Sequence, residues 1–109
     1  MGTGNYNDVT ARLYTDIGLL TSNPYIGSDI SAIFNMITGY SKITDLYKTE
    51  IAPTGLRKKF NAMIERETEN ARQNKEAKII AKMNSLVDKN IIAKLYKASQ
   101  AGVEIELIV

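Results

Sequence analysis

The sequence contains no cysteine and no histidine in its 109 residues. The lack of cysteine excludes disulfides, thiol redox chemistry and thiolate metal sites. The lack of histidine removes the usual general base near neutral pH and the commonest nucleophile–base pairs, and it leaves carboxylates, Lys, Ser, Thr and Tyr. Catalysis by this chain alone would therefore need unusual tuning of those remaining groups.

Long apolar runs are also missing. No stretch of about 18 apolar residues is present, and the N-terminus has no basic segment followed by an apolar one, so the sequence predicts neither a membrane span nor a signal peptide. Cytoplasm is the expected location. The net charge of +2 is too small to indicate a nucleic-acid partner, although eight Lys and Arg between Arg57 and Lys82 outnumber four Glu there.

The two prolines mark the starts of two predicted helices. Asn23 is a good N-cap, Pro24 suits the first helical position, and an apolar stripe predicts a helix over about residues 24–38 that ends at Gly39. Beyond Pro53, an amphipathic pattern predicts a long helix over about residues 55–73, with Thr54 as its candidate cap.

The last third predicts a strand, a helix and a second strand. An apolar run over 77–83 and alternation over 103–109 indicate strands, and the residues between them predict a helix over about 87–101. Ser85 or Asp88 caps this helix and Gly102 ends it. Such a β-α-β unit should have parallel strands. Two further strands are predicted over about 14–21, as a buried strand, and over 46–51, so the fold class is α/β with a mixed sheet.

The richest candidate for ligand binding is the segment from Gly2 to Asp16. Two glycines let backbone N–H groups approach a ligand closely, and amide, guanidinium and phenol groups nearby donate hydrogen bonds to oxyanions. The candidate phosphate-binding residues are Gly2, Thr3, Gly4, Asn5, Arg12 and Tyr14. If the segment is extended, Arg12 and Tyr14 point to the same side. The alternative is a simple turn, with Arg12 neutralised by Asp16 and Tyr14 in the core.

Other side chains have a structural alternative to a function. Arg57, Lys58 and Lys59 either bind an anion at a helix N-terminus or form a solvated face. Lys78 and Lys82 share one strand face and are expected to pair with glutamates of the neighbouring strand. Packing roles are expected for Tyr40, Tyr47, Tyr96, Met63 and Met83.

Several motifs together resemble the ATP-dependent polyphosphate kinases of bacteria. They are Gly-Thr-Gly-Asn-Tyr-Asn and Thr-Ala-Arg-Leu-Tyr-Thr-Asp in residues 2–16, Asp29-Ile30, Phe34-Asn35, the runs 52–60 and 64–67, Lys82 to Asp88, and Leu95 to Val103. They occur in the same order over essentially the whole chain. The resemblance implies an enzyme that reversibly transfers the terminal phosphate of ATP to polyphosphate through a phosphohistidine, with Mg²⁺.

The resemblance also implies a fold and a domain division. The catalytic domains of that family are similar to phospholipase D, so residues 1–50 would end the first such domain and residues 51–109 would begin the second. Gly2 to Asn5 stand where a phosphate-binding turn of that superfamily would be, and Tyr14 matches a tyrosine that contacts nucleotide phosphates. The implied partners are ATP and polyphosphate rather than nucleic acid, and the parent enzyme would be a homo-oligomer.

One departure from the family concerns its histidines. The family has a histidine just before the glycine turn, and here Met1 follows that place, so the expected catalytic histidines lie outside this chain. We therefore expect a fragment that has no catalytic or metal-ligating residue and is inactive alone. Two alternatives remain open. One is a non-catalytic anion- or nucleic-acid-binding module using the basic helix 57–72, with Arg57, Lys58, Lys59, Arg66 and Arg72, and the other is a subunit-interaction domain.

Overall fold

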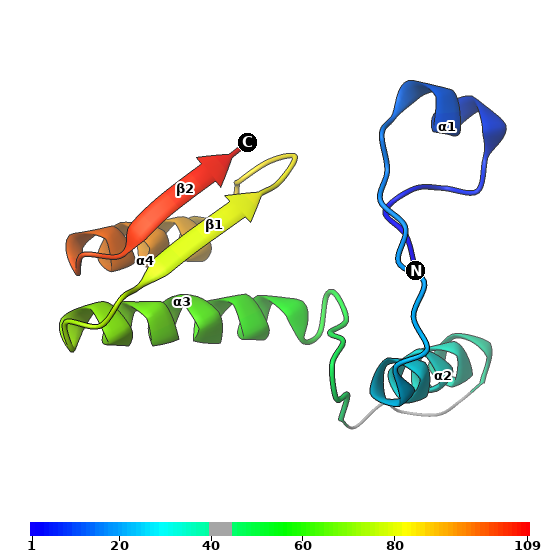
Figure 1. Cartoon of the computed structure of the whole chain (residues 1–109), viewed down its shortest axis with the longest axis horizontal. Helices are drawn as coiled ribbons and strands as arrows, with labels where there is room; N and C mark the ends of the chain where they lie inside the picture. Colours follow the sequence, from blue (N-terminus) through cyan, green and yellow to red (C-terminus); the bar gives the residue numbers. More distant parts are fainter. Residues whose placement is uncertain (40–44) are drawn as a thin grey trace. The chain divides into compact units, whose positions relative to one another are not determined.

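A computed structural model describes residues 1–39 and 45–109 and divides the chain into two compact units, Met1–Thr49 and Glu50–Val109 (Figure 1). The elements are α1 (Asp8–Leu13), α2 (Pro24–Thr38), α3 (Leu56–Arg72), β1 (Lys78–Lys82), α4 (Lys89–Gln100) and β2 (Glu104–Ile108). The expected combination of helices and strands is confirmed, although the sheet formed by the described residues has two strands. Tyr40 lies outside the described residues.

In the first unit, α2 begins and ends where the sequence predicts. The Asn23 side chain accepts hydrogen bonds from the backbone N–H groups of Tyr25 and Ile26, at 3.0 and 3.3 Å. Pro24 is the first helical residue and Gly39 is the C-cap. A capping side chain and a proline that lacks the N–H group together satisfy the start of a helix, which explains the accuracy of this prediction.

The predicted buried strand over residues 14–21 is wrong. Residues 8–13 form the short helix α1, which the Asn7 side chain caps, and the extended chain after it makes only an isolated antiparallel bridge between Gly2 and Gly18. Ile17 and Leu20 remain 75% and 98% exposed. An apolar run becomes a buried strand only where a neighbouring strand and a core face are present, and the described residues of this unit supply neither.

The predicted strand over residues 46–51 is also wrong, because a buried carboxylate binds this segment. Asp29 of α2 is 1% exposed. Its carboxylate accepts hydrogen bonds from the backbone N–H groups of Tyr47, Lys48 and Thr49, at 2.8, 2.7 and 2.8 Å, and from the Thr49 hydroxyl. These donors face a side chain instead of a neighbouring strand. The Tyr47 ring lies 5.5 Å from that of Tyr25, but Tyr47 is 69% exposed, so this contact is at the surface and the predicted packing in a core is wrong.

We expect the hydrogen bonds between the Asp29 carboxylate and residues 47–49 to weaken in acid. Burial raises the pKa of Asp29, but the hydrogen bonds from Tyr47, Lys48 and Thr49 outweigh it and lower the pKa from 3.8 to about 2. A carboxylate whose pKa is lower in the folded state stabilises the fold fully at a pH above its unfolded-state pKa. This stabilisation is lost as the pH falls through the folded-state pKa, here between about pH 4 and about pH 2.

Hydrogen exchange of the three amides between pH 5 and pH 2, corrected for intrinsic rates, tests this expectation. Their protection should fall with pH, and Asp29→Asn should abolish the pH dependence. Protection that is equal at both pH values would contradict the assignment.

In the second unit, the predicted β-α-β arrangement is confirmed. Strands β1 and β2 pair in parallel, with Lys78 opposite Glu104 and Lys82 opposite Ile108, and α4 connects them (Figure 1). The core consists of Ile64 from α3, Leu95 and Ala98 from α4, and Val103 before β2. Ile79 and Ile105, which face each other in the sheet, pack against it. Burial of these apolar side chains is what holds α3 and α4 against the two strands.

Two cap predictions have different outcomes. Helix α3 has Gly55 as its N-cap, without a capping side chain, so the prediction for Thr54 is wrong. Asp88, one of the two candidates, caps α4. The predicted packing is wrong for Tyr96 and Met63, which are 69% and 41% exposed, because the two-stranded sheet and two helices leave the outer faces uncovered.

Gly102 ends α4 with φ of 98°, a backbone conformation that costs an L-amino acid energy. We expect Gly102→Ala to lower the free energy of unfolding by about 1 kcal/mol, because the added Cβ meets no neighbouring atom and only the strained φ counts. Urea unfolding followed by circular dichroism measures this change. A variant as stable as the wild type would contradict the assigned conformation, and Gly18→Ala, which also adds a Cβ in open space, is the control.

Candidate functional site

The N-terminal segment that the sequence singles out forms a closed loop. Thr3 and Ile17 join its two ends, because the N–H group of Thr3 donates to the carbonyl of Ile17 at 3.0 Å. Met1 and Leu19 form the next pair. The N-terminal ammonium of Met1 donates to the carbonyl of Leu19, and the backbone N–H group of Leu19 donates to the carbonyl of Met1. The glycine turn therefore has a fixed base, which is a requirement for any site made of backbone donors.

Asp16 occupies the inner side of that turn. Its carboxylate accepts a hydrogen bond from the Thr3 hydroxyl at 2.7 Å, and the same hydroxyl accepts one from the N–H group of Ile17. At Gly4, a Cβ would lie 2.6 Å from the Asp16 Cγ, so a side chain at this position would displace the Asp16 carboxylate. Both donors of Thr3 are used inside the loop. Among the described residues, the N–H groups of Gly4 and Asn5 have no acceptor, which leaves them free to donate to a ligand.

Arg12 and Tyr14 lie after the glycine turn, but the segment that carries them is not extended as expected. Arg12 is in the last turn of α1, and Tyr14 is its C-cap. Asp16 binds Thr3, and no ion pair with Arg12 occurs within the described part of the chain. The alternative that put Tyr14 in a core is wrong, since its side chain is 68% exposed. Arg12 is exposed as well, so both side chains are accessible to an anion from solvent.

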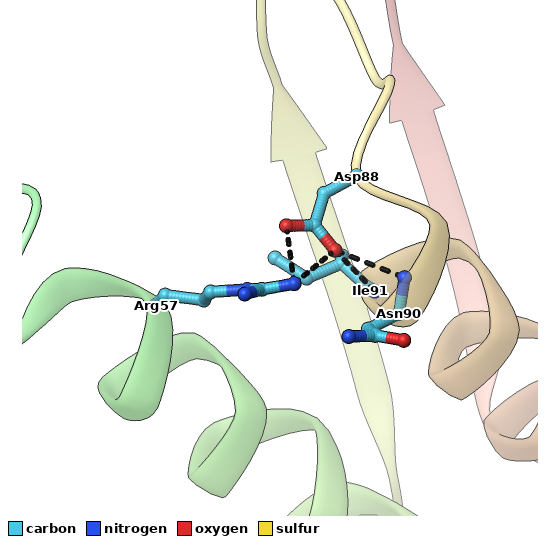
Figure 2. Close-up of polar contacts among 4 residues, drawn as sticks. All are labelled: Arg57, Asp88, Asn90 and Ile91. Carbon is cyan, nitrogen blue, oxygen red and sulfur yellow. Dashed lines mark hydrogen bonds and ion pairs between the residues drawn. The ribbon is translucent and has the colours of Figure 1, made fainter.

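In the second unit, an ion pair joins α3 to the start of α4 (Figure 2). The Nη2 atom of Arg57 lies 3.1 and 2.9 Å from the two carboxylate oxygens of Asp88. Asp88 Oδ1 also accepts the N–H groups of Asn90 and Ile91. The N–H group of Ile91, followed by the Arg57 guanidinium, lowers the pKa of Asp88 below its usual value. Arg57 thus connects two helices and is not simply a solvated cation.

An open cavity of about 530 Å³ lies beside this ion pair. Polar side chains of Thr54, Lys58, Asn61 and Asn90 contribute to its lining, but most of the lining surface is apolar. The Asn61 Oδ1 atom is buried and has no hydrogen-bond partner within the described residues, so this oxygen is available to a donor group. The cavity was not predicted, because residues far apart in the sequence form it.

Several of the remaining cations pair with carboxylates. Lys78 donates to Glu104 and Glu106 at 2.7 and 2.6 Å, as the sequence predicts, and these bonds raise its pKa above the usual value. Arg66 pairs with Glu67, and Arg72 lies near Glu69. Lys82 differs from Lys78, because it has no ion pair in the described part of the chain. The prediction that Lys82 pairs with a glutamate of the neighbouring strand is therefore wrong.

The paired arginines weaken the alternative of a basic binding helix. Three of its five cations, Arg57, Arg66 and Arg72, contact carboxylates of this chain, and each pair largely cancels its own field beyond a few ångströms. Lys58 and Lys59 alone supply little attraction for a polyanion. Residues 1–39 and 45–109 contain no group of three or more His, Cys, Asp or Glu side chains suited to a metal ion, and none of their helices has the length and apolar character needed to cross a membrane.

Comparison with known proteins identifies two family matches along the chain. Residues 1–43 match the family described as polyphosphate kinase C-terminal domain 1, and residues 50–109 match polyphosphate kinase C-terminal domain 2. Among curated proteins, the polyphosphate kinases of Synechocystis sp. and Halalkalibacterium halodurans are each 53% identical over 109 residues, and that of Parasynechococcus marenigrum is 50% identical. Each alignment covers 100% of this chain and 15 or 16% of the relative.

Proposed function

Because this chain belongs to the polyphosphate kinase family, we propose that it acts as part of a longer enzyme that reversibly transfers the terminal phosphate of ATP to inorganic polyphosphate. The observation that supports this function is 53% identity to a polyphosphate kinase over all 109 residues. The chain spans 15% of that relative and contains no histidine. In this proposal the phosphohistidine therefore belongs to other residues of the enzyme, and the chain alone is inactive.

We also propose that both units belong to phospholipase D-like catalytic domains, residues 1–50 to the end of the first and residues 51–109 to the beginning of the second. Within the first unit, the backbone N–H groups of Gly4 and Asn5 and the exposed side chains of Asn5, Arg12 and Tyr14 supply donors for phosphate oxygens. Phosphoryl transfer depends mainly on positioning and on donors directed at the oxygens of the transferred group. In this arrangement Thr3 holds the loop and Gly2 forms its bridge to Gly18.

Mg²⁺ is the cofactor expected for a reaction of ATP, and it would neutralise charge on the phosphates. The described residues do not fit a complete protein-made site for it, since they contain no cluster of three or more acidic side chains. We therefore assign no step of this chain to the metal. ATP and polyphosphate are the proposed substrates, a homo-oligomer is the proposed assembly, and the cytoplasm, where ATP is available, is the proposed location.

Phosphate transfer by the full-length enzyme tests the proposal. We expect formation of acid-insoluble labelled polyphosphate from γ-labelled ATP, formation of ATP from polyphosphate and ADP, and no turnover by residues 1–109 alone. A full-length protein that catalyses neither direction would refute it. The alternative of a nucleic-acid-binding module predicts a salt-sensitive gel shift with RNA or DNA, and binding of polyphosphate without nucleic acid would exclude that alternative.

A further inference from the structure

The carboxyl edge of the β1–β2 sheet carries polar side chains to which the proposed function gives no role. Lys82 ends β1, and Asn84 and Ser85 follow in the loop that leads to α4. All three residues are exposed. In open α/β sheets, ligands bind outside the carboxyl ends of the parallel strands. The topology therefore puts one cation and two hydrogen-bonding side chains at the edge where this kind of sheet binds ligands.

Lys82 differs from Lys78, which lies on the same face of β1. Lys78 has carboxylates of Glu104 and Glu106 at 2.7 and 2.6 Å. The strand register puts Ile108 opposite Lys82. Among the described residues, no carboxylate is within ion-pair distance of the Lys82 ammonium. The strand position opposite Lys78 holds a carboxylate and the one opposite Lys82 holds an apolar side chain, so the charge of Lys82 is available to an anion from outside.

The loop after Lys82 is held at both ends. The N–H group of Met83 donates to the Ile108 carbonyl at 3.0 Å, and Leu86 packs against the core of the unit. At the far end, Asp88 caps α4 and binds Arg57 of α3 (Figure 2). Between these anchors only the tip is free to meet a ligand. Prior ordering of a binding loop reduces the entropy that binding costs.

We propose that Lys82, with Asn84 and Ser85, binds a phosphate group of the substrate at the carboxyl edge of β1. Lys82 Nζ supplies the positive charge, while the Asn84 amide and the Ser85 hydroxyl donate hydrogen bonds. The ligand class is a phosphate of polyphosphate or of a nucleotide. This inference rests on the proposed function, because that function supplies substrates with several phosphate groups.

The experiment compares Lys82→Ala with wild type in the full-length enzyme. Equilibrium binding of polyphosphate alone and of ADP alone is measured, together with KM and kcat for transfer. We expect the Kd for at least one ligand to rise about 10–100-fold, the size of one charge-assisted hydrogen bond. Lys82→Arg should retain most of the affinity. Lys97→Ala removes another exposed lysine, on α4, and should leave both Kd values unchanged.

The outcomes separate the two ligands and the two proposals. Weaker binding of polyphosphate alone assigns the site to the polymer, weaker binding of ADP alone assigns it to the nucleotide, and weakening of both assigns it to a shared phosphate position. Unchanged Kd and KM values for Lys82→Ala in an enzyme that transfers phosphate would overturn this inference and leave the proposed function intact. Should Lys82→Ala melt at a lower temperature than wild type, Lys82→Gln provides the same test with a longer side chain.

Discussion

Replacing Leu95 with alanine should lower the free energy of unfolding of the second unit by about 2–5 kcal/mol. Leu95 is 8% exposed and contacts the core formed with Ile64, Ala98 and Val103. Truncation removes three buried carbons and leaves a cavity between α4 and its neighbours. A unit of this size has a total stability of only roughly 3–9 kcal/mol, so this one change consumes a large part of it.

The measurement is the urea midpoint of the 109-residue chain, followed by circular dichroism. Tyr96→Ala is the matched control, because it truncates a larger side chain at the next position of the same helix, where 69% of the residue is exposed. We expect that change to stay within about 0.5 kcal/mol of wild type. Equal losses for Leu95→Ala and Tyr96→Ala would mean that α4 packs with a different face than described.

Local signals explain which parts of the fold were predictable. Asn23 with Pro24, and Asp88 before α4, are caps whose chemistry acts within three residues, so the helix starts follow from the sequence. The two wrong strands, over residues 14–21 and 46–51, depend on distant partners. The Asp29 carboxylate accepts hydrogen bonds from the N–H groups of residues 47–49, which lie 18 or more positions away in the sequence. No sequence pattern around Asp29 indicates this long-range contact.

The same distinction applies to the candidate sites. The glycine turn and its neighbours were found because small residues and hydrogen-bond donors are consecutive in the sequence, whereas the contact of Thr3 with Asp16 joins positions 13 apart. Likewise, Arg57 was identified as a cation, but its partner Asp88 lies 31 positions away. Lys78 and Lys82 look alike in the sequence, and only the register of β1 with β2 shows that one is neutralised and the other is not.

Removing the Tyr14 hydroxyl or the Asn5 amide should slow phosphate transfer by the full-length enzyme about 10–1000-fold, the range for loss of one donor to a transition-state oxyanion. Neither side chain donates a hydrogen bond within the described residues, and Tyr14 is 68% exposed, so Tyr14→Phe and Asn5→Ala should not change the melting temperature. A lower kcat without a lower melting temperature therefore reports chemistry rather than folding.

Tyr6→Phe is the matched control for this last prediction. Tyr6 belongs to the same loop and is fully exposed, but it is not among the residues assigned to phosphate. Tyr6→Phe should leave kcat unchanged, whereas Tyr14→Phe should lower it. Wild-type rates for both Tyr14→Phe and Asn5→Ala would remove these residues from the site. If only Tyr14→Phe were slow, the donors would come from the end of α1, and the glycine turn would serve to shape the loop, as the contact between Gly4 and Asp16 already does.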